Sequence, residues 1–186
     1  MKILKWILII IAVLALLIYF VGMPYMKSQT KKNSPERTAV YQQDGLDLSV
    51  TYSSPSKKGR VIFGELVPFD KVWRTGANEP TRFETGTDIS LMGKTLPAGT
   101  YSLWTVPGER RWSVIFNSDM PGWGATLVSG GKEATRTEDA DVLQVEVPVI
   151  ITPVAEEQFT IAFENSNGLF LTLAWDTTKV QVPINQ

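Results

Sequence analysis

Apolar residues recur at every second position over much of the chain from Leu46 onward, and this period of two is what most constrains the fold. In residues 46–52 the apolar side chains fall on one side and the polar ones on the other, in the sequence LDLSVTY. Because side chains alternate between the two faces of a β-strand, this segment is predicted to be a half-buried strand. Similar segments predict about ten strands, at residues 46–52, 60–67, 81–85, 88–93, 99–106, 111–116, 141–150, 158–164, 169–176 and 179–184.

Short turns between these segments favour an all-β domain. Asn167-Gly168 is the strongest hairpin signal, because both residues tolerate a positive φ. No stretch after residue 26 keeps apolar residues at helical spacing over three turns. We therefore expect an antiparallel β-sandwich (jelly-roll or immunoglobulin-like), or a barrel, over residues 38–186. Residues 117–140 are rich in Gly, Ser and Thr and are expected to form a long loop.

An apolar run precedes the domain and predicts a membrane segment. It extends without interruption from Ile7 to Val21, and the reach from Ile3 to Met23 is about the ~20 residues that cross a bilayer core. We expect a transmembrane signal-anchor at residues 1–23, followed by a flexible polar linker at 24–37. A cleaved signal peptide is the alternative, although small residues at A-x-A spacing do not follow the run.

Charge is distributed unevenly and leaves the orientation of the anchor open. Two lysines precede the apolar run, whereas Lys27, Lys31, Lys32 and Arg37 follow it, which favours a cytoplasmic domain. A basic start before an apolar run is equally typical of an export signal. From Thr38 onward the chain has 12 Lys and Arg against 18 Asp and Glu, a net charge of −6. This acidic domain lacks the basic surface expected of a nucleic-acid-binding protein.

The chain contains no cysteine and no histidine, and these absences exclude several kinds of chemistry. Disulfides, thiol nucleophiles, cysteine-based metal sites and a lipoprotein anchor are all excluded. A Ser-His-Asp triad is excluded as well. Two loops rich in oxygen ligands, at 117–125 and 129–141, lack the spacing of an EF-hand. We therefore expect neither a metal nor a cofactor.

The sequence VWRTGANEPT, residues 72–81, is the strongest candidate for a binding site. Arg74 has the planar guanidinium that binds carboxylates and other anions in a bidentate manner. Trp73 offers a stacking surface, and Asn78 and Glu79 offer hydrogen-bonding groups. In the structural alternative, Arg74 pairs with Glu79, Asn78 caps a turn and Trp73 belongs to the core.

Two residues of the long loop region join this candidate site. Asn117 follows a predicted strand, and Trp123 stands between two glycines, which favours exposure. Exposed tryptophans would stack on sugar rings, whereas buried ones would fill the core. Trp104 lies on the opposite side of its strand from Leu103, so either Trp104 is exposed or both faces of that strand are covered.

Three longer motifs resemble a known family. They are GRVIFGELVPFDKVWRTGANEPTRFET, GKTLPAGTYSLWTVPGERRWSVIFN and PGWG. Together they resemble the domain of unknown function 2911 (DUF2911), found mainly in Bacteroidota, from about Ser53 to the C-terminus. The resemblance implies an extracytoplasmic β-sandwich, usually behind a signal sequence, and it implies no established activity, ligand or catalytic residue.

These observations predict a membrane-anchored β-sandwich of the cell envelope, with its domain on the periplasmic side. We expect a binding or structural module for a small polar or glycan ligand or for a partner protein. The alternative is a glycosidase-like hydrolase that uses Glu79 and a second carboxylate. Glu65 and Glu84, on adjacent predicted strands, could also meet the spacing of a glycosidase pair. The oligomeric state is not predicted.

Overall fold

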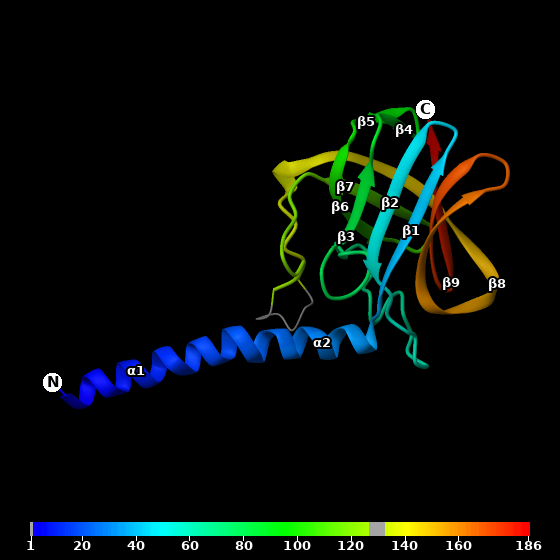
Figure 1. The fold of residues 1–186 in the computed structure, drawn as a ribbon. Helices are drawn as coiled ribbons and strands as arrows, with labels where there is room; N and C mark the ends of the chain where they lie inside the picture. The colour runs from blue at the N-terminus through cyan, green and yellow to red at the C-terminus, as the bar shows by residue number, and fades with distance from the viewer. Residues whose placement is uncertain (1, 127–132) are drawn as a thin grey trace. The chain divides into compact units, whose positions relative to one another are not determined.

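The computed structural model describes residues 2–126 and 133–186, and the chain divides into two units, residues 1–33 and 34–186. The first unit is a continuous helix built from α1 (Lys2–Leu17), the π-helical turn η1 (Ile18–Gly22) and α2 (Met23–Asn33) (Figure 1). The stretch from Ile3 to Asn33 is long and apolar enough to cross a membrane. A signal sequence would have the same length and apolar composition. The apolar helix that the sequence predicts at this end is therefore present.

Pro24 explains the π-helical turn in the middle of this helix. Proline has no N–H, and its ring would clash with the carbonyl four residues earlier in a regular α-helix. The N–H of Met23 donates to the carbonyl of Ile18, five residues back, which is the hydrogen bond of a π-turn. The helix then continues to Asn33, so residues 24–33 are helical where the sequence predicts a flexible linker. Lysine, glutamine and methionine favour helix even without apolar periodicity.

The second unit is an antiparallel β-domain, which confirms the predicted fold class; the sandwich itself stays a prediction. All pairings between the strands of the described ranges are antiparallel. Neighbouring strands follow the order β1-β2-β3-β6-β7-β8-β9-β4-β5. Within the described ranges the strands are β1 (Glu36–Gln43), β2 (Leu46–Ser53), β3 (Thr81–Thr85), β4 (Ile89–Leu91), β5 (Lys94–Leu96), β6 (Gly99–Pro107), β7 (Arg111–Asn117), β8 (Asp141–Asn165) and β9 (Leu169–Asn185).

Strand β8 is the longest strand, and it joins two parts of the sheet (Figure 1). Its first part, up to Pro148, pairs with β7, and its second part, from Val149, pairs with β9. The register shifts between Ile151 and Thr160, which indicates bulges that bend the strand. The curved sheet surrounds one hydrophobic core, whose largest fully buried aromatic side chains are Trp112, Trp175, Phe83, Phe116 and Phe159.

The structure corrects several strand predictions. Residues 60–67 form turns and not a strand, because Gly64 has φ +96° and its N–H donates to the carbonyl of Val67 at 2.9 Å. Glycine adopts this conformation without steric cost, so the chain folds back locally. Each of the last two pairs of predicted strands is a single strand, β8 and β9. Strands β1 and β5 are not predicted, because β1 buries only Tyr41 and β5 has three residues.

One end of the sheet gathers the elements that carry the candidate site. Glu36 at the start of β1 pairs with Ser53 at the end of β2. Thr51 of β2 pairs with Arg82 at the start of β3. The segment that follows β7 covers the neighbouring part of β6, because Ser102 Oγ donates to the carbonyl of Asp119 at 2.6 Å.

Candidate functional site

Residues 73–81 form a sharply folded corner before β3. Trp73 attaches the corner to β6, because its N–H donates to the carbonyl of Thr105 at 2.7 Å and its carbonyl accepts from the N–H of Thr105 at 2.9 Å. The backbone then takes positive φ values at Thr75 (55°), Gly76 (143°) and Asn78 (60°). A β-branched residue such as threonine is strained in this conformation. Such strain persists only where surrounding contacts hold it in place.

Close contacts inside the corner maintain this backbone. A Cβ atom on Gly76 would lie 2.8 Å from the carbonyl oxygen of Ser53, so only glycine fits there without a shift. The hydroxyl of Thr81 donates to the carbonyl of Thr75 at 2.5 Å. Buried Asn78 donates from Nδ2 to Ser53 Oγ at 3.3 Å, across to the end of β2. The motif TGAN therefore specifies a fixed corner.

Trp73 packs at the edge of the core. Its ring stacks on that of Trp175, with centroids 6.1 Å apart and an interplanar angle of 16°. It also makes edge contacts with other aromatic rings, those of Phe63, Trp112 and Phe159. Its Nε1 donates to the carbonyl of Gly76 at 3.1 Å. Trp73 thus packs the corner against the hydrophobic core, as expected in the structural alternative.

Arg74, the next residue, is half-buried and has no comparable contacts. Its Nε is enclosed without a hydrogen-bond acceptor. Within the described residues, no ion pair joins Arg74 to Glu79, which the structural alternative requires. Burial lowers the pKa of the Arg74 guanidinium from its ordinary value, because removal from water disfavours the charged form.

Glu79 lies on a groove of about 540 Å³ beside the corner. Thr38, Thr51 and Arg82 are consecutive partners across β1, β2 and β3, so they form a polar row in this groove. The hydroxyl oxygens of Thr38 and Thr51 lie 3.1 Å apart. The other residues that line the groove are Glu36, Tyr52, Ser53, Pro80, Met120, Pro121 and Gly122.

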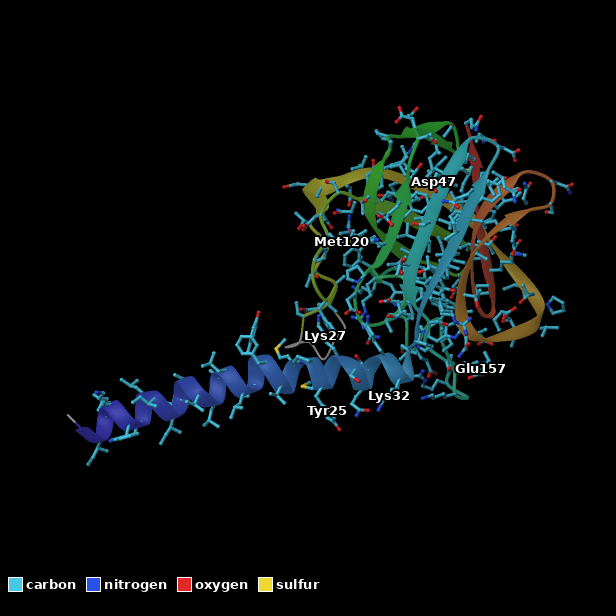
Figure 2. The ribbon with its side chains drawn as sticks, viewed as in Figure 1. Tyr25, Lys27, Lys32, Asp47, Met120 and Glu157 are labelled. Atoms are coloured by element: carbon cyan, nitrogen blue, oxygen red, sulfur yellow. The ribbon has the colours of Figure 1, made fainter. Side chains whose placement is uncertain are left out.

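The segment after β7 forms one wall of the groove. Met120, labelled in Figure 2, lies on this wall. A Cβ atom on Gly124 would lie 2.8 Å from Pro80 Cγ and 3.2 Å from Arg74 Cδ. The aliphatic part of Arg74 and Pro80 therefore both lie close to Gly124, and Pro80 itself lines the groove. Gly124, at φ +72°, permits this close approach.

Asn117 lies beneath the long loop region and not in the groove. It is fully buried, and its Nδ2 donates to the carbonyl of Thr137 at 2.8 Å and to Asp141 Oδ1 at 2.7 Å. Its Oδ1 accepts the N–H of Asp119 at 2.8 Å. Asn117 thus holds the two ends of the loop together.

Trp104 and Trp123 differ in burial. Trp104 is completely buried, and its Nε1 donates to Ser102 Oγ at 2.8 Å. Both faces of β6 are therefore covered at Trp104, which is the second of the two alternatives that the sequence leaves open. Trp123 is half-buried beside Gly124, at the same wall as Arg74. Residues 127–132, in the middle of the predicted loop, lie outside the described residues.

The candidate residues thus separate into two groups. Glu79 lines the groove, and Arg74 and Trp123 lie beside it at Gly124. The other three stabilise the protein around them: Trp73, Asn78 and Asn117. Thr51 and Arg82 are not among the predicted site residues, although the alternation in 46–52 and 81–85 places them on the outer face of the sheet.

The carboxylates give no sign of a metal centre. In residues 2–126 and 133–186, no group of three Asp or Glu residues could hold a metal ion. Glu84 Oε2 pairs with the guanidinium of Arg82 at 2.9 Å and accepts a hydrogen bond from the hydroxyl of Ser49 at 3.0 Å. Glu65 is exposed on the turns before the corner and does not line the groove. Glu36 and Glu79 are the two carboxylates of the groove itself.

Comparison with known proteins identifies the family of the domain. A family model described as "Protein of unknown function (DUF2911)" matches residues 34–184. The match covers most of the chain, so the chain belongs to this family. No curated protein and no solved structure matches it.

Proposed function

We propose that this DUF2911 protein is a binding module, held at a membrane by its N-terminal helix, whose groove receives a small polar ligand such as a saccharide. The main support for this proposal is the groove beside the corner. Its volume of about 540 Å³ falls within the roughly 300–1,000 Å³ that is usual for small-molecule sites.

The groove offers the polar groups that a saccharide needs. Hydroxyls of Thr38 and Thr51 can donate and accept, Glu36 and Glu79 accept, and Arg82 donates. Three strands position these groups, and sites on regular elements hold their geometry better than sites on loops. Met120, Tyr52 and Pro121 add apolar surface for the faces of a sugar ring.

We place the domain on the periplasmic side of the cytoplasmic membrane, with the helix retained. Basic residues before the apolar run match an export signal. The resemblance to a family of exported domains supports the same side. The helix extends through residues 24–33 without a break, and small residues at cleavage spacing do not follow the run. Fractionation of cells with a protease applied to the periplasm tests this placement.

A ligand screen on the full chain in detergent micelles tests the binding function. We expect at least one class of saccharide to raise Tm, and the variant Thr51→Val to weaken its affinity about fivefold, the value of one hydrogen bond. Thr95→Val, on the exposed part of β5, is the matched control and should change nothing. If no compound raises Tm, or if the two variants bind equally well, the groove is not the binding site.

A hydrolase is the second candidate function, because Glu36 and Glu79 line one groove. Glycosidases act through two carboxyl groups that face the scissile bond. In this case Glu79→Gln should abolish turnover of an aryl glycoside while the compound still binds. Turnover that survives in both Glu79→Gln and Glu36→Gln would exclude this chemistry.

A further inference from the structure

Arg74 lacks the partners that half-buried arginines ordinarily have. The described residues give its guanidinium neither a hydrogen bond nor an ion pair, and Nε is enclosed. The two terminal Nη nitrogens are not among the enclosed atoms without a partner, so they keep access to solvent. Arg82, on the groove, differs because Glu84 binds it at 2.9 Å.

The rest of the chain cannot supply the missing carboxylate. Residues 127–132, which lie outside the described ranges, read LVSGGK and contain no acidic side chain. Residues 1–33 contain none either. Glu36 and Glu79, the acids of the groove, already take part in other interactions. The terminal nitrogens of Arg74 are therefore open to an anion from outside the protein.

The position of Arg74 connects it to the groove. Its aliphatic part and Pro80 both contact the site of Gly124, and Pro80 and Gly122 line the groove. A surface arginine that only packs its stem would keep its whole head in water. The enclosed Nε of Arg74 shows that this head is fixed against the wall, with its terminal nitrogens left free to act.

We infer that Arg74 is the receptor of an oxyanion and that the ligand of the groove is acidic, with a carboxylate or a phosphate group at the end that reaches Arg74. This inference rests on the proposed function and specifies the class of ligand. The planar guanidinium binds both kinds of oxyanion through paired N–H donors. The hydroxyls of Thr38 and Thr51 would then bind the uncharged, hydroxyl-bearing part of the same molecule.

Three related probes separate the sources of the oxyanion: glucuronate carries a carboxylate, glucose 6-phosphate a phosphate, and glucose no charge. Each is titrated into the full chain in micelles, and the NMR signal of the Arg74 Nε–H and the amide signals of Thr51 and Arg82 are followed. We expect glucuronate or glucose 6-phosphate to move all of these signals in a saturable way, and glucose to bind more weakly.

Two variants test the role of the charge. Arg74→Gln should lower the affinity for the acidic probe about 10- to 100-fold, the usual value of hydrogen bonds to a charged group. Arg111→Gln removes the same charge from an exposed ion pair on β7 and should leave the affinity unchanged. The position of the amide signals shows whether each variant is folded.

The outcomes distinguish this inference from the proposed function. If glucose binds in the groove as well as the acidic probes do and the Arg74 signal stays fixed, the inference is wrong and the binding function stands. If Arg74 responds to anions while Thr51 and Arg82 do not, Arg74 is an oxyanion site and the groove proposal is wrong. If no probe moves any of these signals at millimolar concentration, both are wrong.

Discussion

Arg74 and Arg136 are both largely buried arginines whose Nε is enclosed without an acceptor, yet among the described residues only Arg136 has carboxylate partners. The side chain of Arg136 is 9% exposed, and its terminal nitrogens pair with Asp141 and, at 2.9 Å, with Glu138. Arg74, in the corner before β3, has no such pair within the described residues. Arg136 is thus neutralised by carboxylates of the protein, whereas no described carboxylate pairs with Arg74.

The difference distinguishes Arg136, which stabilises the fold, from Arg74, which we infer to bind a ligand. Asp141 also accepts a hydrogen bond from Asn117, so Arg136 belongs to a network that closes the long loop region onto β7 and β8. A buried cation that holds a fold together has its carboxylates supplied by the fold. A cation without them costs stability, and this cost is consistent with the oxyanion site that we infer for Arg74.

The largest effect is expected for Arg136→Met. Removing this guanidinium leaves Asp141 half-buried without its main partner, so we expect a loss of about 3 kcal/mol in the free energy of unfolding. Chemical denaturation of the full chain in micelles, followed by tryptophan fluorescence, measures it. Arg111→Met, at an exposed pair on β7, is the control and should change stability by less than ~0.5 kcal/mol. Equal stability of the two variants would place Arg136 outside any structural network.

A smaller loss is expected for Gly76→Ala, which tests whether the corner is rigid enough to fix Arg74. The added Cβ would meet the carbonyl of Ser53 at 2.8 Å, at a φ of +143° that L-residues rarely adopt. We expect a loss of about 2 kcal/mol. Gly93→Ala, at φ +78° with open space around it, separates the backbone cost from the clash and should lose about 1 kcal/mol. A corner that accepts alanine at position 76 as easily as the turn at position 93 is not rigid.

The sequence predicts the β-domain well where local pattern and final environment agree. Residues 46–52 alternate cleanly, and β2 (46–53) follows that segment closely. Residues 60–67 were misassigned, because an apolar run around Gly64 looks the same whether it forms a strand or folds back in turns. The junction of 141–150 and 158–164 was misplaced for a related reason, since a bulged strand interrupts the pattern without interrupting the chain.

The location of the site could be predicted from the sequence, but the contacts of its side chains could not. The density of unusual residues in VWRTGANEPT points to the corner, and the corner is there. Which of two neighbours packs inward depends on contacts distant in the sequence, such as Trp73 with Trp175. Thr51 and Arg82 came from strands that the alternation describes, but only the register between strands shows that they lie side by side.

The smallest effect, and the one that bears most directly on the contrast, is expected for Arg74→Met. Methionine keeps the packing against Gly124 and removes a cation whose pKa burial has lowered. For a base with a lowered folded pKa, the cost is carried at every pH below that pKa and is relieved only as the pH rises through it. Arginine remains protonated at neutral pH, so removing the charge should raise the free energy of unfolding by up to about 1 kcal/mol. Denaturation under the conditions used for Arg136→Met gives the comparison, and a loss of stability similar to that of Arg136→Met would show that Arg74 has a structural partner after all.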